Sequence, residues 1–246
     1  MMHTQQRYPA EACALVKTLG RPCLFSKSIK FTPQNISSDR WLITLPNECC
    51  STPNTINETL GTISPFWKFS PLRYPEHPNH KTPTLIHFGC DKNKNSEIQK
   101  TYFEYDPDDS GIVFIAQKSS KTKAEVHFYC DQPLKEVLPK LNLPYDIQDS
   151  LSTLANYIPS DSPALDVKSQ NSQRHSIDIN LINVQKINII LQKIRELLVS
   201  LGNPEAINFI DTIHTLTHIS IGTNSTGIPF VTLYGPPLWL SPDKQT

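Results

Sequence analysis

The strongest constraint on the fold is a pattern that recurs five times: two short segments of alternating apolar and polar residues, joined by a polar turn. Successive side chains of a β-strand point to opposite faces, so two such segments around a turn are typical of a β-hairpin. The paired segments are 28–31 with 40–45, 85–91 with 99–105, 111–116 with 124–129, 164–168 with 176–181, and 217–223 with 229–234. The sequence therefore predicts ten antiparallel strands.

Helical periodicity fills most of the intervals between these hairpins. The clearest helix is predicted over 184–201, where apolar residues recur every three to four positions and Gly202 follows as a C-cap. Further helical segments are expected at 9–19, 55–67, 133–141, 147–158 and 204–213. The segment 70–84 contains four prolines and is expected to be a loop. No break in composition divides the chain, so we expect a single domain over 1–246.

Alternation divides the residues of the strands between two faces. One face is apolar and should pack against the helices. The other face is polar and collects Lys30, Arg40, Thr44, His87, Lys100, Tyr102, Glu104, Glu125, His127, Tyr129, Asp166, Lys168, Asp178, Asn180, His218, Ser220, Thr232 and Tyr234. Two architectures fit this pattern: an open sheet whose polar face meets water, or a closed barrel that encloses it. Closure would remove the edge strands and create a chamber for a small molecule.

Charge and hydropathy argue against several classes of function. The chain has 23 lysines and arginines against 23 aspartates and glutamates, whereas proteins that bind nucleic acid usually carry a basic excess. No apolar run approaches the roughly 20 residues of a membrane-spanning helix. The N-terminal residues do not resemble a signal peptide. We therefore expect a cytoplasmic protein that binds neither nucleic acid nor membrane.

Short motifs support neither a metal centre nor a nucleotide site. The six cysteines show no C-x-x-C spacing, and H-E-x-x-H, G-x-S-x-G, Walker A and G-x-G-x-x-G motifs are absent. Carboxylates suit Mg²⁺, but the three aspartates of 106–109 lack DDxxD spacing, so we expect a polar turn there. The basic run 118–123 is expected to be a solvated hairpin tip. We predict no metal site and no required cofactor, although Mg²⁺ is compatible with this interpretation.

Five helix-plus-hairpin units resemble the soluble aromatic prenyltransferases of the ABBA type. The strand that ends in Tyr234 is similar to the hairpins of that family, and Lys100 with Tyr102 looks like its strand-borne lysine and tyrosine. The stretch 174–181 is also similar to cyanobacterial proteins, among them indole-cyclising proteins of scytonemin-type pathways. The resemblance implies an α+β fold: an antiparallel ten-stranded β-barrel built from about five helix-plus-hairpin repeats, with helices on the outside.

The resemblance also implies a reaction of secondary metabolism. In that family an allylic diphosphate ionises inside the barrel, basic residues and tyrosines stabilise the charges, and an aromatic carbon takes the prenyl group. The implied substrate-binding residues are Arg40, Lys100, Tyr102, His127, Tyr129, Lys168 and Tyr234. The implied acid–base residues are Glu104, His87, Glu125 and His218. The expected partners are an indole-type aromatic molecule and an allylic diphosphate.

Two alternatives use the same scaffold. In the first, acid–base residues such as Glu104 and His87 cyclise an indole intermediate, and the basic residues are not needed. In the second, the chain is a binding protein without catalytic activity. The open sheet is a third interpretation, in which the basic residues are solvated and the histidines are structural.

Overall fold

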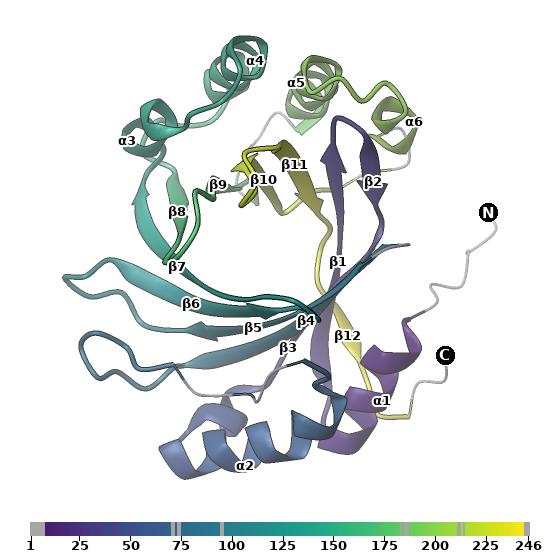
Figure 1. The fold of residues 1–246 in the computed structure, drawn as a ribbon, viewed down its shortest axis with the longest axis vertical. Helices are drawn as coiled ribbons and strands as arrows, with labels where there is room; N and C mark the ends of the chain where they lie inside the picture. Colours follow the sequence, from purple (N-terminus) through teal and green to yellow (C-terminus); the bar gives the residue numbers. More distant parts are fainter. Residues whose placement is uncertain are drawn as a thin grey trace.

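The strands close into a barrel between two layers of helices (Figure 1). The computed structural model describes residues 8–69, 72, 75–93, 96–182, 184, 187–210, 213 and 215–243. Within them the barrel strands are β1 (Cys23–Thr32), β3 (Asp39–Thr44), β4 (Leu85–Asn93), β5 (Ser96–Glu104), β6 (Ile112–Ser119), β7 (Ala124–Pro133), β8 (Pro163–Ser169), β9 (His175–Asn180), β10 (His218–Thr223) and β11 (Pro229–Tyr234). Four of the five predicted hairpins are present with the predicted segments paired, and in the first it is residues 24–27, not 28–31, that pair with β3.

The barrel closes because β1 pairs with a strand on each side. Residues Leu24–Lys27 pair antiparallel with β3, and Ser28–Phe31 pair antiparallel with β11. Two short strands, β2 (Asn35–Ser37) and β12 (Leu238–Leu240), also pair with β1. The closed ten-stranded barrel is therefore confirmed, and the open sheet is excluded.

The helices lie outside the barrel, as predicted. They are α1 (Ala10–Leu19), α2 (Pro53–Ile63), α3 (Leu134–Val137), α4 (Tyr145–Ala155), α5 (Ile187–Ser200) and α6 (Ala206–Ile210). In Figure 1, α1 and α2 cover the lower side of the barrel, and α3 to α6 cover the upper side. Residues 72 and 75–84 of the predicted loop contain no helix or strand, and the rest of 70–84 lies outside the described residues.

Local sequence explains where two of these helices begin and end. Thr52 and Thr55 form a reciprocal capping box at the start of α2, and Pro53 occupies its first turn. Helix α1 ends at Gly20, which adopts the left-handed conformation with a φ of 65°. Both devices satisfy backbone groups that a helix end leaves without partners.

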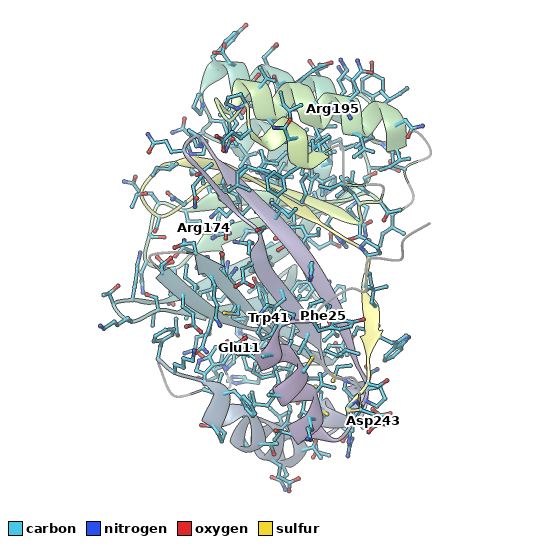
Figure 2. The ribbon with its side chains drawn as sticks, turned by 90° about the vertical axis from the view of Figure 1, so that its right-hand side faces the viewer. Glu11, Phe25, Trp41, Arg174, Arg195 and Asp243 are labelled. Atoms are coloured by element: carbon cyan, nitrogen blue, oxygen red, sulfur yellow. The ribbon has the colours of Figure 1, made fainter. Side chains whose placement is uncertain are left out.

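Two apolar cores join the helices to the outer face of the barrel. The lower core packs α1 and α2 against residues such as Phe25, Ile43 and Phe103. The upper core packs α4 to α6 against Ile177, Ile219 and neighbouring side chains. Figure 2 labels Phe25 and Trp41 in the lower part of the molecule and Arg195 on α5 in the upper part. With the apolar side chains outside, the polar face of most strands lines the interior.

Candidate functional site: a charged chamber inside the barrel

A chamber of about 220 Å³ lies inside the barrel and opens between the hairpin tips. It is lined by Lys30, Arg40, Asp91, Ile98, Lys100, Tyr102, Lys118, Ser119, Ser120, Lys123, Glu125, Tyr129, Arg174, Asp178, Ser220, Asn224, Ser225, Phe230, Thr232 and Tyr234. Six of these side chains are basic and three are acidic. The chamber therefore carries an excess of positive charge within a protein whose net charge is zero.

Asp91 holds two of the cations in a buried network. It forms an ion pair with Arg40 and accepts a hydrogen bond from Lys100 Nζ at 3.3 Å. Ser37 Oγ donates to its other oxygen at 2.9 Å. Burial alone would raise the pKa of Asp91, but Lys100 and Arg40 hold that pKa well below its usual range. These two cations are thus already neutralised in part.

Three other basic side chains form no ion pair with a carboxylate among the described residues: Lys30, Lys118 and Arg174. Lys118 Nζ donates to the Tyr129 hydroxyl at 3.0 Å. The charged groups of Lys30 and Arg174 lie 4.2 Å and 5.3 Å from the centre of the Phe230 ring. Burial and nearby arginines lower the pKa values of Lys30 and Lys118 well below the ordinary value of lysine. Among the described residues, the basic groups in this part of the chamber thus have no carboxylate counter-ion, and burial favours the neutral form of both lysines.

Aromatic side chains form the inner part of the chamber. The Tyr102 and Tyr129 rings pack edge to face, with centroids 5.7 Å apart, and Lys118 Nζ lies within 6 Å of both centroids. Burial raises the pKa values of Tyr102, Tyr129 and Tyr234, so these phenols stay neutral. Behind them a small apolar cluster includes Val167. Such surroundings combine low polarity with π-faces that can stabilise a cation.

Asp178 faces the chamber from β9, with Ser220 of β10 directly opposite it. Its Oδ1 is buried and has no hydrogen-bond partner in the described part of the chain. Burial raises the pKa of Asp178, although Ser220 and His218 act in the other direction. The rings of His218 and Tyr234 pack edge to face, with centroids 6.4 Å apart. His218 itself does not line the chamber.

The predicted acid–base pair, His87 and Glu104, is in contact but lies beyond the chamber. His87 Nε2 is 2.9 Å from Glu104 Oε2, and His87 Nδ1 is 2.8 Å from Thr44 Oγ1. Neither His87 nor Glu104 is among the residues that line the chamber. The rings of Tyr102 and Phe114 pack against His87, with centroids 6.5 Å and 5.8 Å away. The pair therefore forms a second polar site inside the barrel.

The remaining predicted site residues have different positions. Glu125 lines the chamber and forms an ion pair with Lys123. His127 is completely buried and does not line the chamber, and burial together with Lys118 lowers its pKa. Lys168 lies on the outer face, because β8 pairs it with the outward-facing Phe128. The predicted inward position of Lys168 is therefore wrong.

Sequence reasoning overlooked several lining residues, of which the most informative are Asp91, Lys118 and Arg174. Asp91 follows His87 by four positions on the same strand, so alternation places it on the same face. Lys118 was expected in a solvated turn, but β6 continues to Ser119 and turns Lys118 inward opposite Lys100. That expectation is wrong. Arg174 lies just before β9, two positions from the inward-facing Ser176.

Among the described residues, no group of three or more His, Cys, Asp or Glu side chains is arranged to hold a metal ion. In the turn 106–109, Asp108 accepts hydrogen bonds from Asn79 and Ser110. No helix in the described part of the chain has the length and apolar character needed to cross a bilayer.

Comparison with known proteins finds counterparts in structure but not in sequence. No family profile and no curated protein matches the sequence. The 5-dimethylallyltryptophan synthase from Streptomyces coelicolor superposes with a TM-score of 0.62, covering 89% of this chain and 81% of that chain at 12% identity. AnaPT from Neosartorya fischeri superposes with a TM-score of 0.61, covering 87% of this chain and 78% of that chain at 10% identity. The prenyltransferase NotF in complex with brevianamide F and DMSPP gives 0.60, covering 87% and 79% at 12% identity.

The chain has the prenyltransferase-barrel fold. At these identities the likeness concerns the fold, which supports many chemistries in general. What this prenyltransferase barrel does depends on the side chains inside its own chamber.

Proposed function

We propose that the chamber binds an allylic diphosphate and an aromatic, indole-type molecule, and transfers the prenyl group to the aromatic ring. The observation that carries this proposal is the set of three cations without a carboxylate partner, Lys30, Lys118 and Arg174. They face a chamber that also presents tyrosine rings. The prenyltransferases that share the fold support the same conclusion, because one is a dimethylallyltryptophan synthase.

Electrostatics explains why a polyanion suits this chamber. A buried charge without a partner is unfavourable, and the lowered pKa values of Lys30 and Lys118 reflect that cost. A diphosphate would give both lysines and Arg174 charge-assisted hydrogen bonds. Fixed cations in a partly dry site also stabilise the charge that develops on a departing diphosphate. Arg40 and Lys100 add to this field from the neighbouring strands β3 and β5, while they remain paired with Asp91.

The tyrosines have a separate task in this reaction. Loss of diphosphate leaves an allylic carbocation, which water would trap. The rings of Tyr102 and Tyr129 offer their π-faces to this cation, an interaction worth about 2 kcal/mol in a desolvated site. They also exclude water from the inner part of the chamber.

An activity assay tests the proposal. The protein is incubated with dimethylallyl or geranyl diphosphate and with tryptophan or simple indoles, with and without Mg²⁺, and products are detected by mass spectrometry. We expect a product that has gained one prenyl unit. We expect Lys118→Met to reduce kcat/KM roughly 10- to 100-fold, the loss of one hydrogen bond to a charged group.

Lys168→Met is the matched control, because it removes the same charge from the outer face, and its activity should equal that of the unmodified protein. The absence of product with every pair of substrates would contradict prenyl transfer. If diphosphate still bound, the result would favour a binding protein.

One observation favours a second candidate function, the cyclisation of an indole intermediate by acid–base chemistry. Thr44, His87 and Glu104 form a chain of contacts of 2.8 Å and 2.9 Å, which can fix the tautomer of the imidazole and move a proton. In a cyclase of this kind, Glu104→Gln would abolish turnover and Lys118→Met would not. The opposite result supports prenyl transfer.

A further inference from the structure

The three carboxylates that line the chamber differ in the ion pairs and hydrogen bonds that they form. Asp91 is bound by Arg40, Lys100 and Ser37, as described above. Glu125 is paired with Lys123 at the rim. Among the described residues Asp178 forms no ion pair, its Oδ1 has no hydrogen-bond partner, and Ser220 lies directly opposite it on β10. Asp178 is therefore the carboxylate of the chamber that is least neutralised.

Asp178 also shares the lining of the chamber with Tyr102, Tyr129 and Tyr234. These tyrosines come from β5, β7 and β11, and Asp178 comes from β9. The charged and titratable groups that face it are Arg174, Lys118, His218, Tyr102, Tyr129 and Tyr234. None of these cations reaches it closely enough for an ion pair in the described structure. An aromatic molecule that packs against these tyrosines would therefore share the chamber with the Asp178 carboxylate.

We propose that Asp178 is the base that removes the proton from the aromatic ring after prenyl transfer, rather than His87 or Glu104. This inference rests on the proposed function. His87 and Glu104 are separated from the chamber by the aromatic rings that pack against His87. Asp178 is in the chamber itself.

The step balances as follows. The C–O bond of the allylic diphosphate breaks, and its electron pair leaves with the diphosphate. A π-pair of the ring forms the new C–C bond, which leaves one ring carbon saturated and the ring positively charged. Asp178 takes the proton from that carbon, and the C–H electron pair restores the aromatic ring. Ser220, directly opposite on β10, favours the charged form of the carboxylate that takes up this proton.

The test compares Asp178→Asn with the unmodified protein in the prenyl-transfer assay. We expect kcat to fall by about 10²–10⁴-fold, the usual contribution of a positioned base. The Kd for dimethylallyl diphosphate should change little. Burial raises the pKa of Asp178, and the carboxylate must be deprotonated to act as a base. The activity of the unmodified protein should therefore fall toward acidic pH, with a midpoint above the pKa of an ordinary aspartate. This acidic limb of the pH profile should be absent from the residual activity of Asp178→Asn.

Isotope and rescue measurements separate a base from a structural residue. With an acceptor deuterated at the reacting carbon, Asp178→Asn should show a larger primary isotope effect, since proton removal becomes rate-limiting. Asp178→Glu should recover part of kcat. Asp109→Asn, in an exposed turn, is the control and should leave all values unchanged.

Two results would overturn the inference while leaving prenyl transfer intact. One is full activity of Asp178→Asn with its acidic limb retained. The other is loss of the limb in Glu104→Gln instead. If the unmodified protein transfers no prenyl group at all, the proposed function fails and the role of Asp178 fails with it.

Discussion

At the scale of single residues, Asp91 divides the cations of the chamber into two groups. Arg40 and Lys100 share its negative charge, whereas Lys30 and Lys118 form no ion pair with any carboxylate that the structure describes. A bound anion would therefore raise the pKa values of Lys30 and Lys118 most, because within the described structure it would be their first negatively charged partner. This division also predicts how binding should depend on pH.

We expect affinity for dimethylallyl diphosphate to fall as the pH rises above about 8. Burial and Arg40 lower the pKa of Lys100 to about 8, and a bound anion would raise that pKa again. Below about 8, Lys100 is charged in both states and adds no pH dependence. Above it, the free lysine is neutral, so binding must take up a proton. Lys30 and Lys118, whose pKa values are also lowered, add to the uptake.

Calorimetry near pH 8 in two buffers of different ionisation enthalpy measures this uptake directly. Lys100→Met provides the comparison and should take up fewer protons than the unmodified protein. Release of protons on binding, or an affinity that increases with pH, would be inconsistent with a site built from partly neutral lysines.

The chamber residues show what the sequence could and could not predict at this scale. The alternation of polar and apolar residues correctly predicted that Arg40, Lys100 and Tyr234 face inward, because the other face of their strands is apolar. It failed for Lys168, because the apolar side chains of β8, Leu165 and Val167, face the interior of the barrel, so Lys168 faces outward. Val167 packs inside against Tyr129, and no pattern in the strand itself distinguishes that environment from the outer core.

At the scale of elements, two of the five hairpins, 85–105 and 217–234, share a physical requirement. Each has a glycine where a neighbouring strand comes very close. A Cβ atom at Gly222 would lie 2.2 Å from the His175 carbonyl oxygen and 2.4 Å from Ser176 Cα. A Cβ atom at Gly89 would lie 2.7 Å from the Trp41 carbonyl oxygen. The repeated glycine thus reflects close strand packing, which sequence similarity alone could not explain.

We expect Gly222→Ala to lower the free energy of unfolding by about 1–3 kcal/mol, because the added methyl group must push β9 and β10 apart. Gly61→Ala is the matched control on α2, where an added Cβ has open space. It should stabilise the protein by up to about 1 kcal/mol, through the better helix propensity of alanine. Denaturant unfolding of both variants measures the difference. Equal stabilities would show that the strands can separate at no cost.

At the scale of the whole molecule, closure of the sheet could not be deduced from alternation. An open sheet and a barrel both need strands with one polar and one apolar face. Closure depends on the pairing of Ser28–Phe31 with Val231–Tyr234, segments at opposite ends of the chain. Once the sheet is closed, side chains that would be solvated in an open sheet face one another. This converts scattered basic residues into a chamber with unpaired positive charge.

The measurement that tests this charged chamber most directly is calorimetric titration with dimethylallyl diphosphate. Three proteins are compared: the unmodified chain, Lys118→Met from inside the barrel and Lys168→Met from outside it. We predict one molecule bound per chain, an affinity roughly 10- to 100-fold weaker in Lys118→Met, and no change in Lys168→Met. No binding by the unmodified chain, or equal losses in both variants, would contradict an anion site inside the barrel.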